Sequence, residues 1–192
     1  AAFDGDTVAA TLAFARYLRD EEPGVALMSL VDYENDAVRT SLEVARAMRS
    51  EFGDGVLTAV RVDTSERLID ASLIGDPEVW GRAKLTGVNA WLVRKMRAAL
   101  DAEGFGYVGI VASGGFTPSK IRRFEGEGVP VVAYGVGSSL LGHSDPSSGL
   151  LNDFDFTADL VQVDGHAEAK IGRSFRENPR LVRVDWSSVL PG

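Results

Sequence analysis

Cysteine is absent from this chain of 192 residues, and histidine occurs only twice. Without cysteine the chain has no disulfide bond, no thiolate metal site and no cysteine nucleophile. His143 lies in a polar stretch and His166 lies beside a turn signal, so neither has the spacing of a metal site. We expect both histidines at the surface.

Long apolar runs and positive charge are also scarce. No apolar run is long enough to span a bilayer and no secretory leader pattern is present, so we expect a cytoplasmic protein without a membrane partner. The net charge of −8 provides no basic stripe, which argues against a nucleic-acid partner. The same charge would repel an anionic ligand, so such a ligand needs local backbone amides, a few Arg or Lys side chains, or a bridging divalent cation.

Helical and strand signals alternate along the first 141 residues. Helices are predicted to begin after cap residues Asp6, Asn35, Asn89 and Thr117, the last followed by Pro118. Short apolar runs predict strands at 25–31, 56–62, 107–112 and 131–134, with a long loop at 66–86. This alternation indicates an α/β fold whose parallel sheet is buried on both faces.

The pattern changes near residue 140. Residues 142–153 are rich in Gly, Ser, Asp and Pro, which predicts a mobile loop. Asp164-Gly165 between two apolar stretches is a strong hairpin signal, and residues 181–186 form a last extended stretch. We therefore expect a partial α/β barrel at 1–141, a loop at 142–157, and a C-terminal β ribbon and tail at 158–192.

Two of the predicted strands end in glycine clusters. The first glycine turn is Ser113-Gly114-Gly115, and the second is 135–139, with Gly135, Gly137 and Ser138. A strand that ends in glycines before a helix exposes N–H groups that bind anions, although glycines also serve simply to make tight turns. Because two such ends are adjacent, we expect a phosphate site. The expected phosphate-binding residues are Ser113, Gly114, Gly115, Gly135, Gly137 and Ser138.

The position of these turns suggests a barrel. In closed βα barrels the loops after the last two strands frequently hold phosphate, and here the glycine turns follow the last two strands. Only four strands precede the end of the series, where a barrel needs about eight. We interpret the chain as the C-terminal half of a βα barrel of the TIM type, with about four parallel strands followed by an antiparallel ribbon.

Charged side chains are predicted at the ends of the first two strands. Arg61 and Asp63 are two residues apart on a strand, so they share a face and lie at the catalytic edge of such folds. A structural ion pair is the alternative, but the neighbouring glycine turns favour a functional role. Asp32 and Ser65 are further candidates, and Asp32 could bind a ligand hydroxyl or a metal or simply cap a helix. Lys120, Arg122 and Arg123 are expected on a solvated helix face.

Several motifs in order along the chain resemble nicotinate phosphoribosyltransferase, and together they span almost the whole chain. They are Gly-Asp-Thr-Val-Ala-Ala-Thr-Leu (5–12), Val-Arg-Val-Asp-Thr-Ser (60–65), Ile-Val-Ala-Ser-Gly-Gly-Phe-Thr-Pro-Ser-Lys-Ile (110–121), Ala-Tyr-Gly-Val-Gly-Ser-Ser-Leu (133–140), Asp-Phe-Thr-Ala-Asp-Leu-Val (155–161) and Asn-Pro-Arg-Leu (178–181). The resemblance implies a type II phosphoribosyltransferase barrel with an additional N-terminal β-rich domain.

The resemblance also implies an activity. Such an enzyme joins nicotinate to phosphoribosyl pyrophosphate, releasing pyrophosphate, with Mg²⁺ and coupled ATP hydrolysis, in NAD salvage. Arg61 would lie at the pyridine and phosphoribosyl end of the site, and Asp63 would face the ribose hydroxyls or the metal. The two glycine turns would hold the 5′-phosphate.

Parts of the family's site would lie upstream of Ala1, including its phosphorylated histidine and its base-stacking aromatic residues. We therefore expect the isolated chain to be inactive and to need an N-terminal half or a partner chain, and its open sheet edges predict self-association into a homo-oligomer. Three alternatives stay open: a non-catalytic phosphoribosyl-binding half-barrel, an enzyme specific for nicotinamide or quinolinate, and a fragment that binds nothing.

Overall fold

A computed structural model describes residues 2–81, 84–137, 139, 143–145, 150–152, 158–177 and 179–180 of the chain. Its centre is a parallel sheet in the order β1 (Leu27–Leu30), β2 (Leu57–Val62), β3 (Gly109–Ala112) and β4 (Ala133–Tyr134). The helices are α1 (Thr7–Glu21), α2 (Ala37–Phe52), α3 (Ala90–Ala102) and α4 (Pro118–Gly126), with a short 3₁₀ helix, η1, at Ala71–Leu73. The predicted α/β class and its four parallel strands are confirmed.

Side-chain caps define most helix starts as the sequence predicts. The carboxylate of Asp6 accepts a hydrogen bond from the Ala9 N–H, and the side chain of Asn89 accepts from Leu92. The start of α2 differs by one residue, because Asp36 is the cap. Asn35 has a left-handed backbone (φ +55°), and its side-chain amide instead donates to the carbonyl of Ile69 at 2.8 Å, which ties down the loop after β2.

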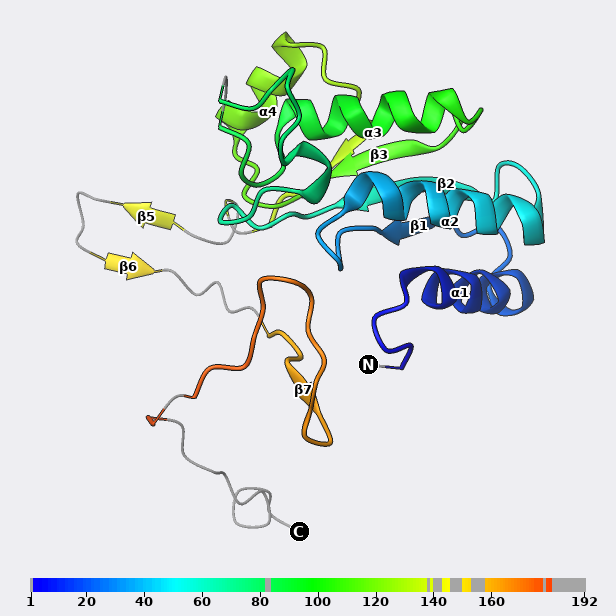
Figure 1. The fold of residues 1–192 in the computed structure, drawn as a ribbon, viewed down its shortest axis with the longest axis horizontal. Helices are drawn as coiled ribbons and strands as arrows, with labels where there is room; N and C mark the ends of the chain where they lie inside the picture. The colour runs from blue at the N-terminus through cyan, green and yellow to red at the C-terminus, as the bar shows by residue number, and fades with distance from the viewer. Residues whose placement is uncertain are drawn as a thin grey trace.

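One face of the sheet is covered by helices, and the core lies between this face and the helices. Figure 1 shows α1, α2 and α3 arranged along the sheet, and α1 contacts α2, which in turn contacts α3. Val60, Ile110 and Ala112 point into this layer and are almost completely buried. Fully buried side chains such as Leu92 and Met96 of α3 pack against them.

The expectation that both faces are buried is wrong for β1. Met28 and Leu30 alternate with the buried Leu27 and Ser29, and each is 43 % exposed. Leu30 pairs in register with Arg61, so Arg61 also extends from this second face. The physical reason is that α1, α2 and α3 lie on the other side of the sheet. In a closed barrel the second face would be covered by the barrel's own further strands, and this sheet has four.

Two short antiparallel pairs follow the parallel sheet. β5 (His143–Asp145) pairs with β6 (Leu150–Asn152) inside the range that the sequence predicts to be loop, which corrects that prediction because a backbone ladder does not need an apolar sequence. β7 (Gln162–Val163) and β8 (His166–Ala167) form the predicted hairpin, with positive φ at Asp164 and Gly165 as a tight turn requires. The predicted stretch 181–186 lies outside the described residues.

Among the described residues, none of the helices is both long and apolar enough to cross a bilayer.

Candidate functional site at the carboxyl ends of the strands

The polar residues predicted at the strand ends lie along one edge of the sheet. Asp32 follows β1, Asp63 follows β2, and Ser113 follows β3. The ladder continues past the assigned strands, because the Ser113 N–H donates to the Val62 carbonyl at 2.9 Å and the Gly135 N–H donates to the Ala112 carbonyl at 2.8 Å. Neighbouring parallel strands therefore present these residues together, as in α/β folds that bind ligands at this edge.

Arg61, Asp63 and Ser113 form a hydrogen-bonded group. The Arg61 guanidinium donates to the Asp63 carboxylate at 2.8 Å through one Nη, and to the Ser113 hydroxyl at 2.8 Å through Nε. This confirms the prediction that Arg61 and Asp63 point together. Their side chains are 42 % and 33 % exposed, so both retain surface that a ligand could contact.

Asp32 is completely buried and is paired within the fold. Its side chain has no exposed surface, and its Oδ2 accepts from the ammonium of Lys170 at 2.5 Å and from the backbone N–H of Asp63 at 3.2 Å. Its other oxygen, Oδ1, is buried without a hydrogen-bond partner among the described residues. Asp32 is therefore a buried carboxylate paired with Lys170, and the helix cap that was the alternative for this residue is supplied by Asp36 instead.

The first glycine turn packs closely against acidic side chains. Gly114 (φ +90°) and Gly115 (φ +62°) both have left-handed backbones. A Cβ on Gly114 would lie 2.9 Å from Oδ1 of Asp63, and one on Gly115 would lie 2.7 Å from Oε1 of Glu66. The left-handed backbone favours glycine at both positions, and a Cβ at either one would also displace the end of an acidic side chain. A phosphate on this side of the turn would meet two carboxylates, so an anion has to approach from the other side.

The second glycine turn combines one close contact with open space. A Cβ on Gly135 would lie 2.8 Å from the Cβ of Ser113, so this glycine lets two strand ends approach. Among the described residues other than its chain neighbours, none has an atom within 4 Å of the position that a Cβ on Gly137 would take. The Ser139 hydroxyl donates to the Phe116 carbonyl at 2.9 Å, which joins the two turns. Ser138 lies outside the described residues.

The sequence predicts a solvated Lys120, and the structure corrects this. It is half-buried, and its ammonium donates to the Gly114 carbonyl at 3.0 Å and lies 4.3 Å from the centre of the Phe116 ring. Burial lowers the pKa of this amine, and the negative charge of Glu66 opposes that shift. The aliphatic stem of Lys120 packs while its head reaches back to the first glycine turn. Arg122 and Arg123 are exposed, as predicted.

Charges of both signs meet at this edge although the whole chain is acidic. Cationic groups of three residues and carboxylates of three residues meet here, and they are Arg61, Lys120, Lys170, Asp32, Asp63 and Glu66. Within the described part of the chain, no group of three His, Cys, Asp or Glu residues has the geometry of a metal site. Ser65 is half-buried in the loop, where its hydroxyl accepts from the Arg67 N–H at 3.4 Å.

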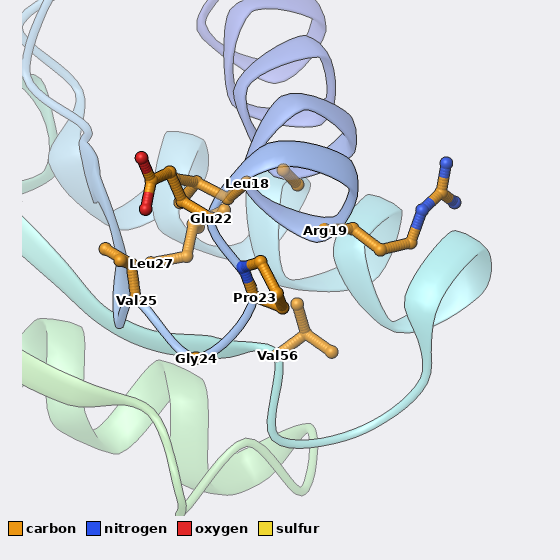
Figure 2. A pocket seen from close by; sticks show the side chains of 9 residues that line it. Leu18, Arg19, Glu22, Pro23, Gly24, Val25, Leu27 and Val56 are labelled. Atoms are coloured by element: carbon orange, nitrogen blue, oxygen red, sulfur yellow. The ribbon is translucent and has the colours of Figure 1, made fainter.

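A separate apolar pocket lies at the opposite edge of the sheet. Figure 2 shows it between the end of α1 and the amino ends of β1 and β2, where Leu18, Val25, Leu27 and Val56 line it. The pocket has a volume of about 240 Å³. Because it faces the amino ends of the strands, it shares none of the polar residues of the candidate site.

The hairpin side chain His166 is exposed, as expected.

A parallel α/β sheet with its polar groups and glycine turns at the carboxyl edge is the architecture of half a βα barrel. The structure is similar to the crystal structure of nicotinate-nucleotide pyrophosphorylase from Pyrococcus furiosus, with a TM-score of 0.50 and 28% sequence identity. The match covers 90% of this chain and 35% of that chain, so this chain spans about a third of its neighbour's length. No family model and no curated protein gives a significant match.

This likeness supports the expected fold class, part of a phosphoribosyltransferase-type barrel. It does not single out nicotinate phosphoribosyltransferase. Sequence reasoning found Arg61, Asp63 and both glycine turns, and it missed Lys170 and Glu66. Neither of these two residues belongs to a recognisable motif. Lys170 reaches the edge from the segment that follows the C-terminal hairpin.

Proposed function

We propose that this chain is the barrel portion of a phosphoribosyltransferase that acts on a pyridine base, with nicotinate as the favoured base. The observation that carries the proposal is the group formed by Arg61, Asp63 and Ser113 beside two glycine turns at one sheet edge. The motif resemblance to nicotinate phosphoribosyltransferase supports the same class, as does the likeness to a pyrophosphorylase named for nicotinate nucleotide.

The proposed chemistry is displacement at the anomeric carbon of phosphoribosyl pyrophosphate. The bond from this carbon to pyrophosphate breaks and a bond to the pyridine nitrogen forms, so positive charge builds on the ribose while pyrophosphate leaves as an anion. Asp63, as a carboxylate near the ribose, would stabilise that positive charge. Arg61 would bind the departing pyrophosphate or the carboxylate of the base. Rigid backbone support of both residues would contribute through positioning.

The 5′-phosphate is assigned to the side of the glycine turns away from Asp63 and Glu66. The open space at Gly137 and the exposed backbone at Gly115 would admit its oxygens, with N–H groups as donors. Lys120, whose ammonium is bound to the Gly114 carbonyl of the first turn, would contribute positive charge near the phosphate.

Mg²⁺ and ATP are proposed only on the strength of the motif resemblance. Asp63 is a partly exposed carboxylate at the edge and would serve as one ligand, which is compatible with Mg²⁺ because this ion commonly takes most of its ligands from substrate oxygens and water. When bound, the ion would neutralise charge on pyrophosphate. Coupled ATP hydrolysis remains a prediction for the complete enzyme.

A quinolinate-type enzyme is the second candidate, and the likeness to the pyrophosphorylase fits it at least as well. Nicotinate and phosphoribosyl pyrophosphate give nicotinate mononucleotide and pyrophosphate. Quinolinate and phosphoribosyl pyrophosphate would give the same two products and carbon dioxide. Nicotinamide is the third base, and it would leave Arg61 without a base carboxylate to bind.

The open sheet face supports a requirement for further strands. Met28 and Leu30 are exposed on the face that a closed barrel buries, and the chain corresponds to about a third of its neighbour. We propose that an N-terminal half, a partner chain or a second copy covers this face. Replacing Leu30 with Gln should then weaken self-association in sedimentation experiments, whereas replacing the exposed Tyr17 of α1 with Gln should not.

The function is tested by adding each base with phosphoribosyl pyrophosphate, Mg²⁺ and ATP to the chain, alone and with the missing barrel strands supplied as a second chain. Nicotinate-dependent release of pyrophosphate supports the main proposal, and quinolinate-dependent release of carbon dioxide supports the second. Calorimetry with nicotinate mononucleotide separates these outcomes from a non-catalytic binding module, which would bind without turnover. If Arg61→Ala and Asp63→Ala leave turnover in the completed enzyme unchanged, the assigned site is wrong.

A further inference from the structure

The backbone of Asp63 is held on both sides by one small network. Its N–H donates to Oδ2 of Asp32 at 3.2 Å, and its carbonyl accepts from the Lys170 ammonium at 2.9 Å. The same ammonium donates to the same Asp32 oxygen at 2.5 Å, which closes a ring of three contacts. Asp32 has no exposed side-chain surface and Lys170 is 21 % exposed, so water has little access to these bonds.

Lys170 reaches this network from a segment that packs against the same loops. The Ile171 N–H donates to the Tyr33 carbonyl at 2.9 Å, just after β1. Gly172 has φ +89°, and a Cβ there would lie 2.7 Å from Cδ1 of Leu68, in the loop after β2. The segment is therefore fitted closely to both loops, and the side chain of Lys170 extends from it to the peptide groups of Asp63.

We propose that Lys170 is a positioning residue of the candidate site and that segment 168–172 is part of this site. The inference rests on the proposed function, because Asp63 is the carboxylate assigned to the ribose. Fixing both peptide groups that flank Asp63 fixes the direction of its Cα–Cβ bond, from which the side chain extends towards Arg61. The Asp63 carboxylate then accepts a hydrogen bond from Arg61 at 2.8 Å, and Arg61 in turn donates to the Ser113 hydroxyl at 2.8 Å. The position of Asp63 therefore also influences the positions of Arg61 and of Ser113 at the end of β3.

The ion pair between Lys170 and Asp32 allows the positioning role of Lys170 to be distinguished from a role in stability alone. Removing the ammonium leaves the buried carboxylate of Asp32 without its cation, which destabilises the fold. Replacing Asp32 with Asn as well removes that uncompensated charge but does not restore a donor to the Asp63 carbonyl. A stabilising role and a positioning role therefore predict different behaviour for the double variant.

The first experiment needs no ligand. Amide hydrogen exchange is measured by NMR on the full chain and on Lys170→Met, Lys170→Arg and Arg173→Gln. Arg173 directly follows this segment but pairs with the exposed Asp159, so it is the matched control. We expect the Asp63 amide to exchange at least tenfold faster in Lys170→Met, at the wild-type rate in Arg173→Gln, and at an intermediate rate in Lys170→Arg. An unchanged rate in Lys170→Met overturns the proposal.

The second experiment measures affinity for phosphoribosyl pyrophosphate with Mg²⁺ by calorimetry. We expect Lys170→Met to bind at least tenfold more weakly than wild type, and the Asp32→Asn, Lys170→Met double variant to recover thermal stability while binding equally weakly. Wild-type affinity in the double variant would show that Lys170 acts on stability alone and would overturn the proposal. If the wild-type chain binds neither alone nor with the missing barrel strands supplied as a second chain, the proposed function fails. The exchange rate of the Asp63 amide, whose acceptor Asp32 is paired with Lys170, still tests the network without any ligand.

Discussion

The ammonium of Lys170 lies 2.5 Å from the carboxylate of Asp32, although 138 residues separate the two in the sequence. This ion pair joins the segment after the C-terminal hairpin to the end of the first parallel strand. It is placed directly behind Asp63, one of the two side chains on which the proposed chemistry depends. The candidate site is consequently built from both ends of the described chain.

Removal of the Asp32 carboxylate should destabilise the fold strongly. Asp32→Ala leaves the Asp63 N–H and the Lys170 ammonium without their shared acceptor, and losing one partner of a buried pair costs about 3 kcal/mol of unfolding free energy. Urea unfolding measures this change. The control is Asp20→Asn, because Asp20 pairs with Arg19 at the exposed surface and its loss should leave the midpoint unchanged. A similar midpoint for both variants would contradict the burial of Asp32.

The two glycine turns should respond differently to alanine. Gly114→Ala forces a side chain into a left-handed backbone (φ +90°) and towards Asp63, so we expect a loss of about 1–2 kcal/mol in unfolding free energy. Gly137→Ala meets open space at an ordinary backbone conformation, so its effect should stay within about 0.5 kcal/mol. Denaturant unfolding of both variants checks this. Equal losses would show that the first turn is not held as described.

Phe124 should be the most sensitive position of α4. Its side chain is completely buried and packs edge-to-face on Phe116 and Tyr134, with ring centres 5.0 Å and 6.3 Å apart. Phe124→Ala should cost about 3–5 kcal/mol of unfolding free energy because it leaves a cavity. Phe14→Ala, which removes a ring that is 48 % exposed on α1, should change stability much less. Comparable effects of the two changes would place Phe124 outside the core.

Asp70 should make the fold less stable as pH rises above about 4. Burial raises the pKa of its carboxyl group, although the N–H groups of Ala37 and Ser72 oppose that shift. Above the ordinary aspartate pKa of about 4, the native state retains a proton that the unfolded chain has lost, so unfolding free energy falls with pH until the native pKa is passed. Asp70→Asn removes this dependence. Urea midpoints at pH 4 and pH 7 should therefore diverge between wild type and variant, and parallel behaviour would refute the raised pKa.

Local sequence signals were sufficient for the sheet and half of the candidate site. Apolar runs and cap residues predict β1 to β4 and the start of most helices, because these features depend on neighbours in the chain. Arg61 and Asp63 could be paired in advance, since residues two apart on a strand share a face. The glycine turns could be located because each directly follows a predicted strand. The close packing of the first turn against Asp63 and Glu66 could not be foreseen.

What the sequence could not predict depends on contacts between distant segments. Lys170 is one of several lysines, and nothing near it indicates that it reaches Asp32. Lys120 has the spacing of a solvated helix residue, and only the position of Gly114 gives its ammonium a partner. The exposed face of β1 was missed because an apolar run has the same sequence whether or not a second layer covers it.

The most direct test of the proposed function is where a phosphoribosyl ligand binds. Nicotinate mononucleotide is titrated into the isotope-labelled chain, alone and with the missing barrel strands supplied as a second chain, and backbone amide shifts are followed by NMR. The account predicts that the largest shifts fall at Gly114, Gly115, Gly135 and Gly137 at the carboxyl edge of the sheet. Shifts confined to Val25 and Val56 at the opposite pocket, or no saturable shifts at all, would contradict it.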